Sequence, residues 1–486
     1  MKKFISILTA FAIAFSLTTI SPAYNTPVFA EEQKILEYTP QGDEFSGYTF
    51  DYYVNPDGKT LTIINADYDF SYRDGHLIIP EKIGKYEVSA IEKSDIWFVE
   101  SVSIPANSKY FKLVDDVLYT YDMETLIFYL RKGKEESFTV PKSVKHISPY
   151  SFNNTGLFYS TKLNKVNFNE GLLTIGESAF FRMVIESFSI PASVEEIGTD
   201  ALNTPSLKNL QVHKDSEHFT MVDGSLLSKD LKTLVWYPNL ESKTSYTIPE
   251  TVITVVDQAL ISLRGRKIHS LKITKNVEYL SNIRLPLVEN IAIDKENKHY
   301  AVKDNVLYTK DMKKLVCYPA NREGSSFVVP NTVEVLGESS FWSAYNIESI
   351  KLPNNLKKIE PSAFEWSVIT QITIPKRVTE IPYRCFLLST IERITFESDT
   401  LTIGKEAFYY TELEDITLPD NTVYIGDYAF GDISNLYSIT LPASIRFIGR
   451  DIFINGYVRK ITVTKGSYAE QYVDKFYPDY KVVVSE

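Results

Sequence analysis

The sequence contains little cysteine. Its 486 residues include 2 cysteines, Cys317 and Cys385, which lie 68 positions apart. Exported proteins that are held together by disulfides usually carry more cysteines at closer spacings. We therefore expect that the packing of side chains, and not a disulfide framework, stabilises this chain.

Motifs that would indicate catalysis or metal binding are missing as well. The chain has no G-x-S-x-G, no P-loop and no H-E-x-x-H, and none of its 6 histidines forms an H-x-x-x-H pair. The acidic turns Asp115-Asp116 and Asn55-Pro56-Asp57-Gly58 lack the D-x-D-x-D-G pattern with a distant Glu that binds calcium. We therefore expect no enzyme activity, no cofactor and no metal site.

Positive charge is also in deficit. The chain has 51 Lys and Arg against 62 Asp and Glu, which gives a formal net charge of −11 at pH 7. An acidic surface repels phosphate groups. This balance argues against a nucleic acid or an anionic lipid as the partner.

Long apolar runs are absent except at the N-terminus. Lys2 and Lys3 precede an apolar run that extends to Leu17, and Val28-Phe29-Ala30 closes a more polar stretch. This order predicts a secretory signal peptide that is cleaved after Ala30, because the run is shorter than the ~20 residues that a membrane helix needs. The mature chain is expected to have no membrane span, to be a monomer and to be secreted, either free or associated with the cell surface.

What the sequence does have is a repeat of 22 or 23 residues. An apolar residue followed by proline recurs at Ile104-Pro105, Ile190-Pro191, Ile248-Pro249, Leu352-Pro353, Ile374-Pro375, Leu418-Pro419 and Leu441-Pro442. A small or apolar residue followed by Phe recurs in phase, and from Phe341 to Phe453 the steps are 23, 22, 22, 22 and 23. An Ile-Gly pair forms the third column, at Ile175, Ile197, Ile403, Ile425 and Ile448. A fixed period of this length is typical of a solenoid.

The consensus unit, x-I-T-I-P-x-S-V-x-x-I-G-x-x-A-F, has a physical interpretation. I-T-I alternates apolar and polar residues, which predicts a short strand with one buried face. Proline ends the strand because it cannot donate to a continuing ladder, and Gly allows a tight turn or a positive φ. One unit cannot bury its own apolar face, whereas a stack of units can.

These columns resemble the bacterial BspA-type, or treponeme-like, leucine-rich repeats over about residues 74 to 465. The resemblance implies an α/β repeat solenoid: a curved stack of short parallel strands with turns and short helical pieces on the other side. It also implies an extracellular or surface protein that serves adhesion or partner binding and not catalysis.

Departures from the unit predict the remaining organisation. A longer module recurs near residues 109–131, 218–238 and 299–319, and its alternating runs around a polar turn predict an inserted β-hairpin each time. Turn signals and aromatic residues predict a hairpin cap over residues 46–73. Ser467 and Glu470 predict a capped helix within a helix–strand cap over 466–486. The predicted parts are a signal peptide (1–30), a flexible lead-in (31–45), the N-terminal cap (46–73), the solenoid (74–465) and the C-terminal cap (466–486).

Candidate binding residues are those expected to point outward from the I-T-I strands. Thr suits exposed strand positions in any protein, so structural and functional interpretations of this column both stand. The candidates are Lys351, Thr373, Thr395, Thr417, Thr440, Thr462, Gln371, Arg393 and Asp415.

Three hypotheses about function follow. The first is a non-catalytic recognition scaffold that binds a host or neighbouring-cell protein through the strand face. The second is a carbohydrate-binding protein for wall or extracellular polysaccharide, which requires exposed aromatic side chains in a row on one face. The third is an enzyme with a site in the hairpin region, residues 203–335, which requires a cleft with converging polar groups.

Overall fold

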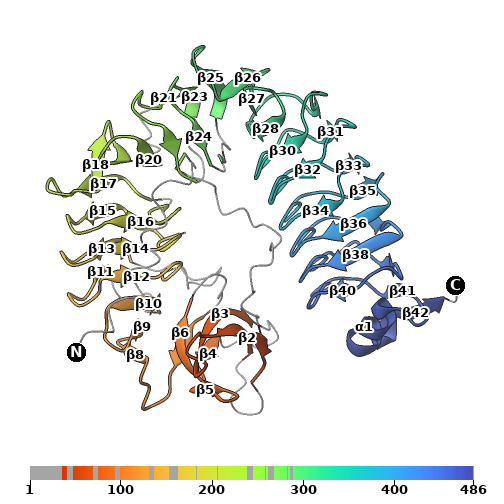
Figure 1. Ribbon diagram of the computed structural model, residues 1–486, viewed down its shortest axis with the longest axis horizontal. Helices are drawn as coiled ribbons and strands as arrows, with labels where there is room; N and C mark the ends of the chain where they lie inside the picture. The colour runs from red at the N-terminus through yellow and green to blue at the C-terminus, as the bar shows by residue number, and fades with distance from the viewer. Residues whose placement is uncertain are drawn as a thin grey trace. The chain divides into compact units, whose positions relative to one another are not determined.

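The computed structural model describes residues 36–40, 47–68, 75–92, 99–130, 136–152, 163–181, 183–204, 206–237, 245–257, 259–260, 268–281, 283–284 and 288–484. The predicted signal peptide lies outside the described residues. Within them the chain forms a repeat solenoid, so the predicted fold is confirmed. Each turn contributes a strand to one or both of two ladders, and neighbouring turns follow one another along the chain (Figure 1).

The first ladder contains the I-T-I strands, and their neighbours are parallel wherever they pair. Its strands are β4 (His76–Ile78), β7 (Ser101–Ser103), β11 (Ser137–Thr139), β13 (Lys165–Asn167), β15 (Ser187–Ile190), β17 (Asn209–Val212), β21 (Ser245–Thr247), β23 (Ile268–Ile273), β25 (Val288–Ile293), β29 (Ser326–Val328), β31 (Ser349–Lys351), β33 (Gln371–Ile374), β35 (Arg393–Phe396), β37 (Asp415–Ile416), β39 (Ser438–Leu441) and β41 (Lys460–Thr464).

A second ladder of short parallel strands occupies the side where helical pieces were expected. The segment before each Ile-Gly pair is too short for a helix, and it hydrogen-bonds to the same segment of the next turn instead. Its strands are β12 (His146–Ile147), β14 (Thr174–Ile175), β16 (Glu196–Ile197), β22 (Thr254–Val255), β24 (Tyr279–Leu280), β30 (Val335–Leu336), β32 (Lys358–Ile359), β34 (Glu380–Ile381), β36 (Thr400–Ile403), β38 (Asn421–Ile425) and β40 (Phe447–Ile448).

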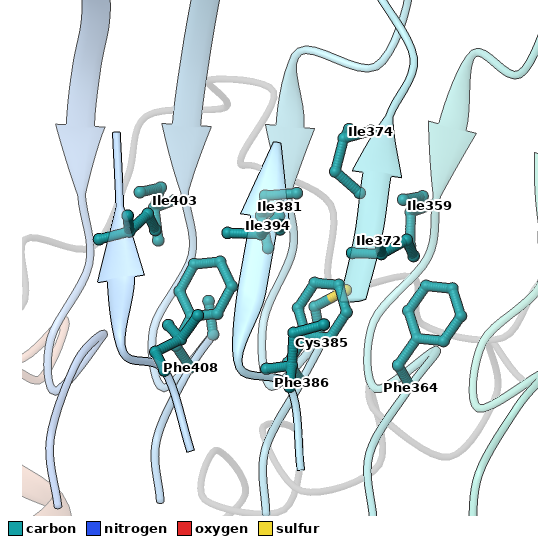
Figure 2. Close-up of a cluster of buried hydrophobic side chains, with 14 of the residues drawn as sticks. Ile359, Phe364, Ile372, Ile374, Ile381, Cys385, Phe386, Ile394, Ile403 and Phe408 are labelled. Carbon is teal, nitrogen blue, oxygen red and sulfur yellow. The ribbon is translucent and has the colours of Figure 1, made fainter. Parts of the chain in front are cut away.

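A column of phenylalanine rings fills the interior between the ladders. Phe364, Phe386 and Phe408 are fully buried, and their rings stack with centroids 5.1 Å and 5.4 Å apart and nearly parallel planes (7° and 5°). Figure 2 shows these rings in successive turns beneath the isoleucines of both ladders. Because each ring contacts the rings of the turns before and after it, the core is continuous through these turns.

The Ile-Gly glycine is required by close backbone approach. A Cβ on Gly404 would lie 2.6 Å from the backbone N of Tyr383, and one on Gly426 would lie 2.5 Å from that of Lys405. The positive φ falls two residues later, for example at Glu406 (56°). Glycine is therefore needed because neighbouring turns are too close for a side chain.

Each inserted module is a three-stranded antiparallel unit, one strand more than the predicted hairpin. Aspartates in the left-handed region, such as Asp115 (49°) and Asp223 (49°), form the tight turn between its first two strands. The third strand then pairs in parallel with the second ladder. The strands are β8 (Phe111–Val114), β9 (Val117–Thr120), β10 (Thr125–Tyr129), β18 (Phe219–Val222), β19 (Ser225–Ser228), β20 (Thr233–Trp236), β26 (Tyr300–Lys303), β27 (Val306–Thr309) and β28 (Lys314–Cys317).

The buried apolar residues form four clusters that meet at these modules. One cluster ends at Leu226 and the next begins at Leu227, on adjacent positions of β19. The other two boundaries fall in β8–β10 and in β26–β28. The modules therefore divide the core into blocks.

The N-terminal part forms a five-stranded sheet in the order β1-β2-β3-β6-β5. The hairpin of β2 (Tyr48–Val54) and β3 (Thr60–Tyr68) lies within the predicted cap. The sheet is larger than the cap, because β5 (Lys82–Ile83) and β6 (Tyr86–Ile91) belong to it. In addition, β1 (Leu36–Tyr38), which falls in the predicted lead-in, pairs with β2.

The C-terminal end contains α1 (Tyr468–Phe476), η2 (Pro478–Tyr480) and β42 (Lys481–Val484), which extends the first ladder in parallel beside β41. The Ser467 hydroxyl accepts a hydrogen bond from the Glu470 N–H (3.1 Å), and the Glu470 carboxylate accepts one from the Gly466 N–H (2.7 Å). These reciprocal bonds fix the helix start. Among the described residues, no helix is long and apolar enough to cross a membrane.

Replacing one ring of the column tests its contribution to stability. We expect Phe386→Ala to lower the free energy of unfolding by about 3–5 kcal/mol, because a fully buried ring leaves a cavity between two stacked neighbours. Chemical denaturation followed by circular dichroism measures the change. Thr373→Ala, on the exposed face of β33, is the control and should change the free energy of unfolding by less than about 0.5 kcal/mol. Equal effects of the two changes would contradict the role of the column.

Candidate functional site

The candidate residues named from the sequence lie on the outward face of the first ladder. Eight of the nine are exposed and Thr462 is half-buried. Strand pairing sets several side by side: Gln371 opposite Arg393, Thr373 opposite Thr395, and Thr440 opposite Thr462. Their alternation with buried isoleucines places them on one face. The structure therefore assembles a polar strand face, without showing a ligand on it.

A hollow of about 290 Å³ opens on the same face of the first ladder, over β13, β15 and β17. Register brings its polar side chains together, with Lys165 opposite Ser187, Ser187 opposite Asn209, and Ser189 opposite Gln211. Asn167, Glu170 and His213 complete its polar lining. The hollow thus collects amides, hydroxyls and charges of both signs.

An apolar wall borders this hollow. The ring of Phe168 stacks on the buried Phe188 with the planes 4° apart and the centroids at 5.7 Å. A wall that cannot hydrogen-bond, facing side chains that can, is the usual composition of a binding hollow.

The candidate residues from the sequence did not include this hollow. Asn209 and Gln211 lie on β17, which ends at Val212. Val212-His213 stands where other turns have Ile-Pro, so that signature is missing there. Their spacing around the buried Leu210 still follows the alternation of a half-buried strand. That alternation is the sequence feature from which the outward position of Asn209 and Gln211 could have been predicted.

The enzyme hypothesis for residues 203–335 gains no support from this hollow. His213 accepts a hydrogen bond from the Asp215 N–H (3.3 Å) and lies 3.8 Å from the Asp215 carboxylate. The described residues of the hollow therefore assemble no hydrogen-bonded pair of nucleophile and base. In the same part of the chain, the described residues contain no group of three side chains that could hold a metal ion.

The two cysteines are buried, and they are not joined in a disulfide. Cys385 lies in the turn after β34 and packs beside Phe386 in the core (Figure 2). Burial raises the pKa of its thiol well above the ordinary value, which removes the thiolate that a nucleophile needs. Its position indicates packing.

Two carboxyl groups have raised pKa values, and each lies in the turn that follows a strand of the second ladder. Burial raises the pKa of Asp200 from 3.8 to about 7, against the opposing effect of the hydrogen bond that Asn203 donates. Burial and the nearby Asp257 raise the pKa of Glu338 from 4.5 to about 7.

Arg284 provides positive charge to both groups. It donates a hydrogen bond to the Ser339 hydroxyl (3.2 Å) and lies 3.8 Å from the Glu365 carboxylate. Lys314 and Glu360 form an ion pair beside Glu338 (2.6 Å). Raised carboxyl pKa values can mark an acid catalyst, but here burial of the two carboxyl groups is the main cause, and the positive charges nearby oppose it.

The pH dependence of stability tests these two carboxyls. A folded-state pKa above the ordinary value means that the folded protein holds more protons, so stability falls as pH rises from about 4 to about 7 and then levels off. Each group accounts for at most about 4 kcal/mol over this range. We expect the double variant Asp200→Asn, Glu338→Gln to flatten the thermal-midpoint profile over this range and to raise the midpoint at pH 8. Asp415→Asn, at an exposed position, is the control and should keep the original slope; an unchanged slope in the double variant would refute the assignment.

Comparison with solved structures finds repeat proteins of bacteria. A leucine-rich repeat protein from Eubacterium ventriosum is 19% identical, covers 73% of this chain and 94% of its own, and has a TM-score of 0.42. The pneumococcal vaccine antigen PcpA is 18% identical, with 93% and 99% covered and a TM-score of 0.36. A leucine-rich repeat protein from Bacteroides ovatus is 17% identical, with 92% and 100% covered and a TM-score of 0.33. At this level of similarity they say nothing about a ligand.

No curated protein matches the sequence. A sequence model of the BspA type Leucine rich repeat region does match it, with 6 copies, over residues 124–235, 155–284, 317–415 and 401–477. The matched residues make up more than half of the chain and include the phenylalanine column and strands of both ladders. The chain therefore belongs to the BspA-type leucine-rich repeat family.

Proposed function

We propose that the protein is an exported, non-catalytic scaffold that binds an extracellular protein partner on the outward face of the first ladder. The observation that carries this proposal is the hollow over β13, β15 and β17, where polar side chains from three turns converge in register. The predicted signal peptide supports export, and the family supports binding without catalysis.

The chemistry of the hollow suits a polypeptide. Asn209 and Gln211 can each donate to a carbonyl and accept from an N–H, which are the groups that a peptide backbone presents. Lys165 and Glu170 add one charge of each sign. The backbone N–H and C=O groups of a partner segment can therefore hydrogen-bond to the two amides. Lys165 and Glu170 can favour partner segments that carry side chains of the opposite charge.

The strand face over β31 to β41 offers a second, flatter contact area. Arg393 forms an exposed ion pair with Glu414 at 2.9 Å. Exposed pairs of this kind contribute little to stability, so Arg393 can exchange this contact for one with a partner at small cost. The threonines beside it present hydroxyls without bulk.

Binding of the exported protein to a panel of purified extracellular-matrix proteins tests the proposal. We expect saturable binding to at least one of them. Asn209→Ala, Gln211→Ala should weaken that binding by more than about 10-fold, because each amide loses paired hydrogen bonds. Thr395→Lys, Thr417→Lys should weaken it as well if the contact extends along the strand face. Biolayer interferometry measures the affinities, and circular dichroism checks that each variant unfolds cooperatively.

The matched control is Lys358→Ala, Glu380→Ala, which removes two exposed side chains from the second ladder. This variant should bind as the unaltered protein does. Equal loss in the control and in the hollow variant, or no saturable binding to any matrix protein, would contradict the proposal.

A further inference from the structure

Four exposed aromatic side chains gather in the C-terminal turns, and we call them the aromatic ridge. They are Trp366 (43% exposed), Tyr410 (58%), Tyr437 (64%) and Tyr457 (60%). Trp366 and Tyr410 each stand two residues after a buried ring of the phenylalanine column. Tyr437 directly precedes β39, and Tyr457 shortly precedes β41.

Backbone hydrogen bonds connect the turns that carry the ridge. The Trp366 N–H donates to the carbonyl of Leu387, and the Tyr410 N–H donates to that of Gly431, both at 2.9 Å. Leu388 donates to Tyr409 between them, also at 2.9 Å. Because each turn is bonded to the next, equivalent positions lie in one row at about 4.8 Å per turn. Trp366 and Tyr410 therefore lie in one row along the solenoid, two turns apart, whereas Tyr437 and Tyr457 occupy other positions of their turns.

The backbone at Trp366 and Tyr410 is unfavourable for these residue types. Their φ angles are 61° and 56°, in the left-handed region, where bulky side chains are outliers. Ser343, Asp432 and Asn455 occupy the same position in other turns, and such small polar residues tolerate this conformation better. The exposed rings therefore carry a steric cost that filling the core does not explain.

Two residues of the aromatic ridge, Tyr437 and Tyr457, line a hollow of about 480 Å³. The rings of Tyr437 and Tyr457 come from successive turns, and Glu414, Ser434 and Asn435 complete the lining. The Tyr457 N–H donates to the Ile433 carbonyl (3.0 Å), and the Arg459 N–H donates to the Tyr437 carbonyl (2.9 Å), so the two turns are held together. The Arg459 guanidinium lies over the Tyr457 ring at 5.3 Å.

The polar groups in this hollow are oriented by their neighbours. Asn435 donates its side-chain amide to the Glu412 carboxylate at 2.9 Å, and Arg393 donates to the Glu414 carboxylate at 2.9 Å. The hollow thus combines two exposed rings with an amide, a carboxylate and a hydroxyl.

We infer that the aromatic ridge and its hollow form a binding site for an uncharged polysaccharide. A pyranose ring has an apolar C–H face, which stacks on an aromatic ring, and a rim of neighbouring hydroxyls, which pair with carboxylates and amides. Exposed rings on several turns suit a chain of such sugars. Arg393 and Arg459 balance the charges of Glu412 and Glu414 around the hollow, and the net charge of −11 on the chain disfavours an acidic polysaccharide.

This site is distinct from the hollow proposed to bind a protein. The first hollow lies over β13, β15 and β17, whereas the ridge belongs to turns between residues 366 and 457. The two proposals can therefore fail separately. Asn209→Ala, Gln211→Ala should leave polysaccharide binding unchanged.

Native affinity electrophoresis of the exported protein in gels that contain a soluble neutral β-glucan, a neutral mannan or no polysaccharide tests the inference. A hexamer of N-acetylglucosamine, added in solution and followed by tryptophan fluorescence, tests the amino-sugar chains typical of cell walls. We expect retardation or a saturable fluorescence change with at least one of these probes. Tyr437→Ala, Tyr457→Ala should weaken binding by at least about 10-fold, and Tyr437→Phe, which keeps the ring, should bind as the unaltered protein does.

The structure supplies a matched control. Tyr424 and Phe447 are also exposed and stack on each other at 4.9 Å, but they lie on the second ladder, outside the hollow. Tyr424→Ala, Phe447→Ala should leave the affinity within about twofold. Binding to none of the three neutral probes would overturn the inference. Binding only to heparin, an acidic polysaccharide run as a further probe, would overturn it as well. Equal losses of affinity in Tyr437→Ala, Tyr457→Ala and in this control would also overturn it.

Discussion

The contact between a phenylalanine ring and the rings of the neighbouring turns is the interaction on which this structure depends. A turn of 22 or 23 residues has too little interior to bury its own isoleucines. The rings of Phe364, Phe386 and Phe408 join the interiors of successive turns within one block of the core. Close stacking of turns then forces glycine where backbones approach and places a positive φ two residues later. The two ladders are the hydrogen-bonded result of that stacking.

The sequence predicts the features that repeat. Three columns in phase define the period, the first ladder and the residues that line the core, and the structure confirms the solenoid. The second ladder was not predicted, because strands of two residues such as Glu380–Ile381 are too short to show an alternation. They are identified as strands only through pairing with the next turn, and single-sequence patterns contain no information about that pairing.

Some of the candidate binding residues could likewise be predicted from the sequence, and others could not. The outward threonines follow from alternation and are exposed where the pattern places them. The hollow over β13 to β17 depends on which neighbouring turns carry short or long side chains, as at Ser187 beside Lys165 and Asn209. Such juxtaposition arises from residues about 22 positions apart. Two of the four ridge residues could have been found by aligning the turns at their phenylalanines, which sets Trp366, Leu388 and Tyr410 in one column.

The three inserted modules divide the solenoid into blocks that can unfold separately under tension. Buried clusters meet at these modules, and at one boundary they adjoin at consecutive residues, Leu226 and Leu227. Because each block has its own core, tension applied along the chain would extend one block at a time while the others stay folded. The chain would then lengthen in steps.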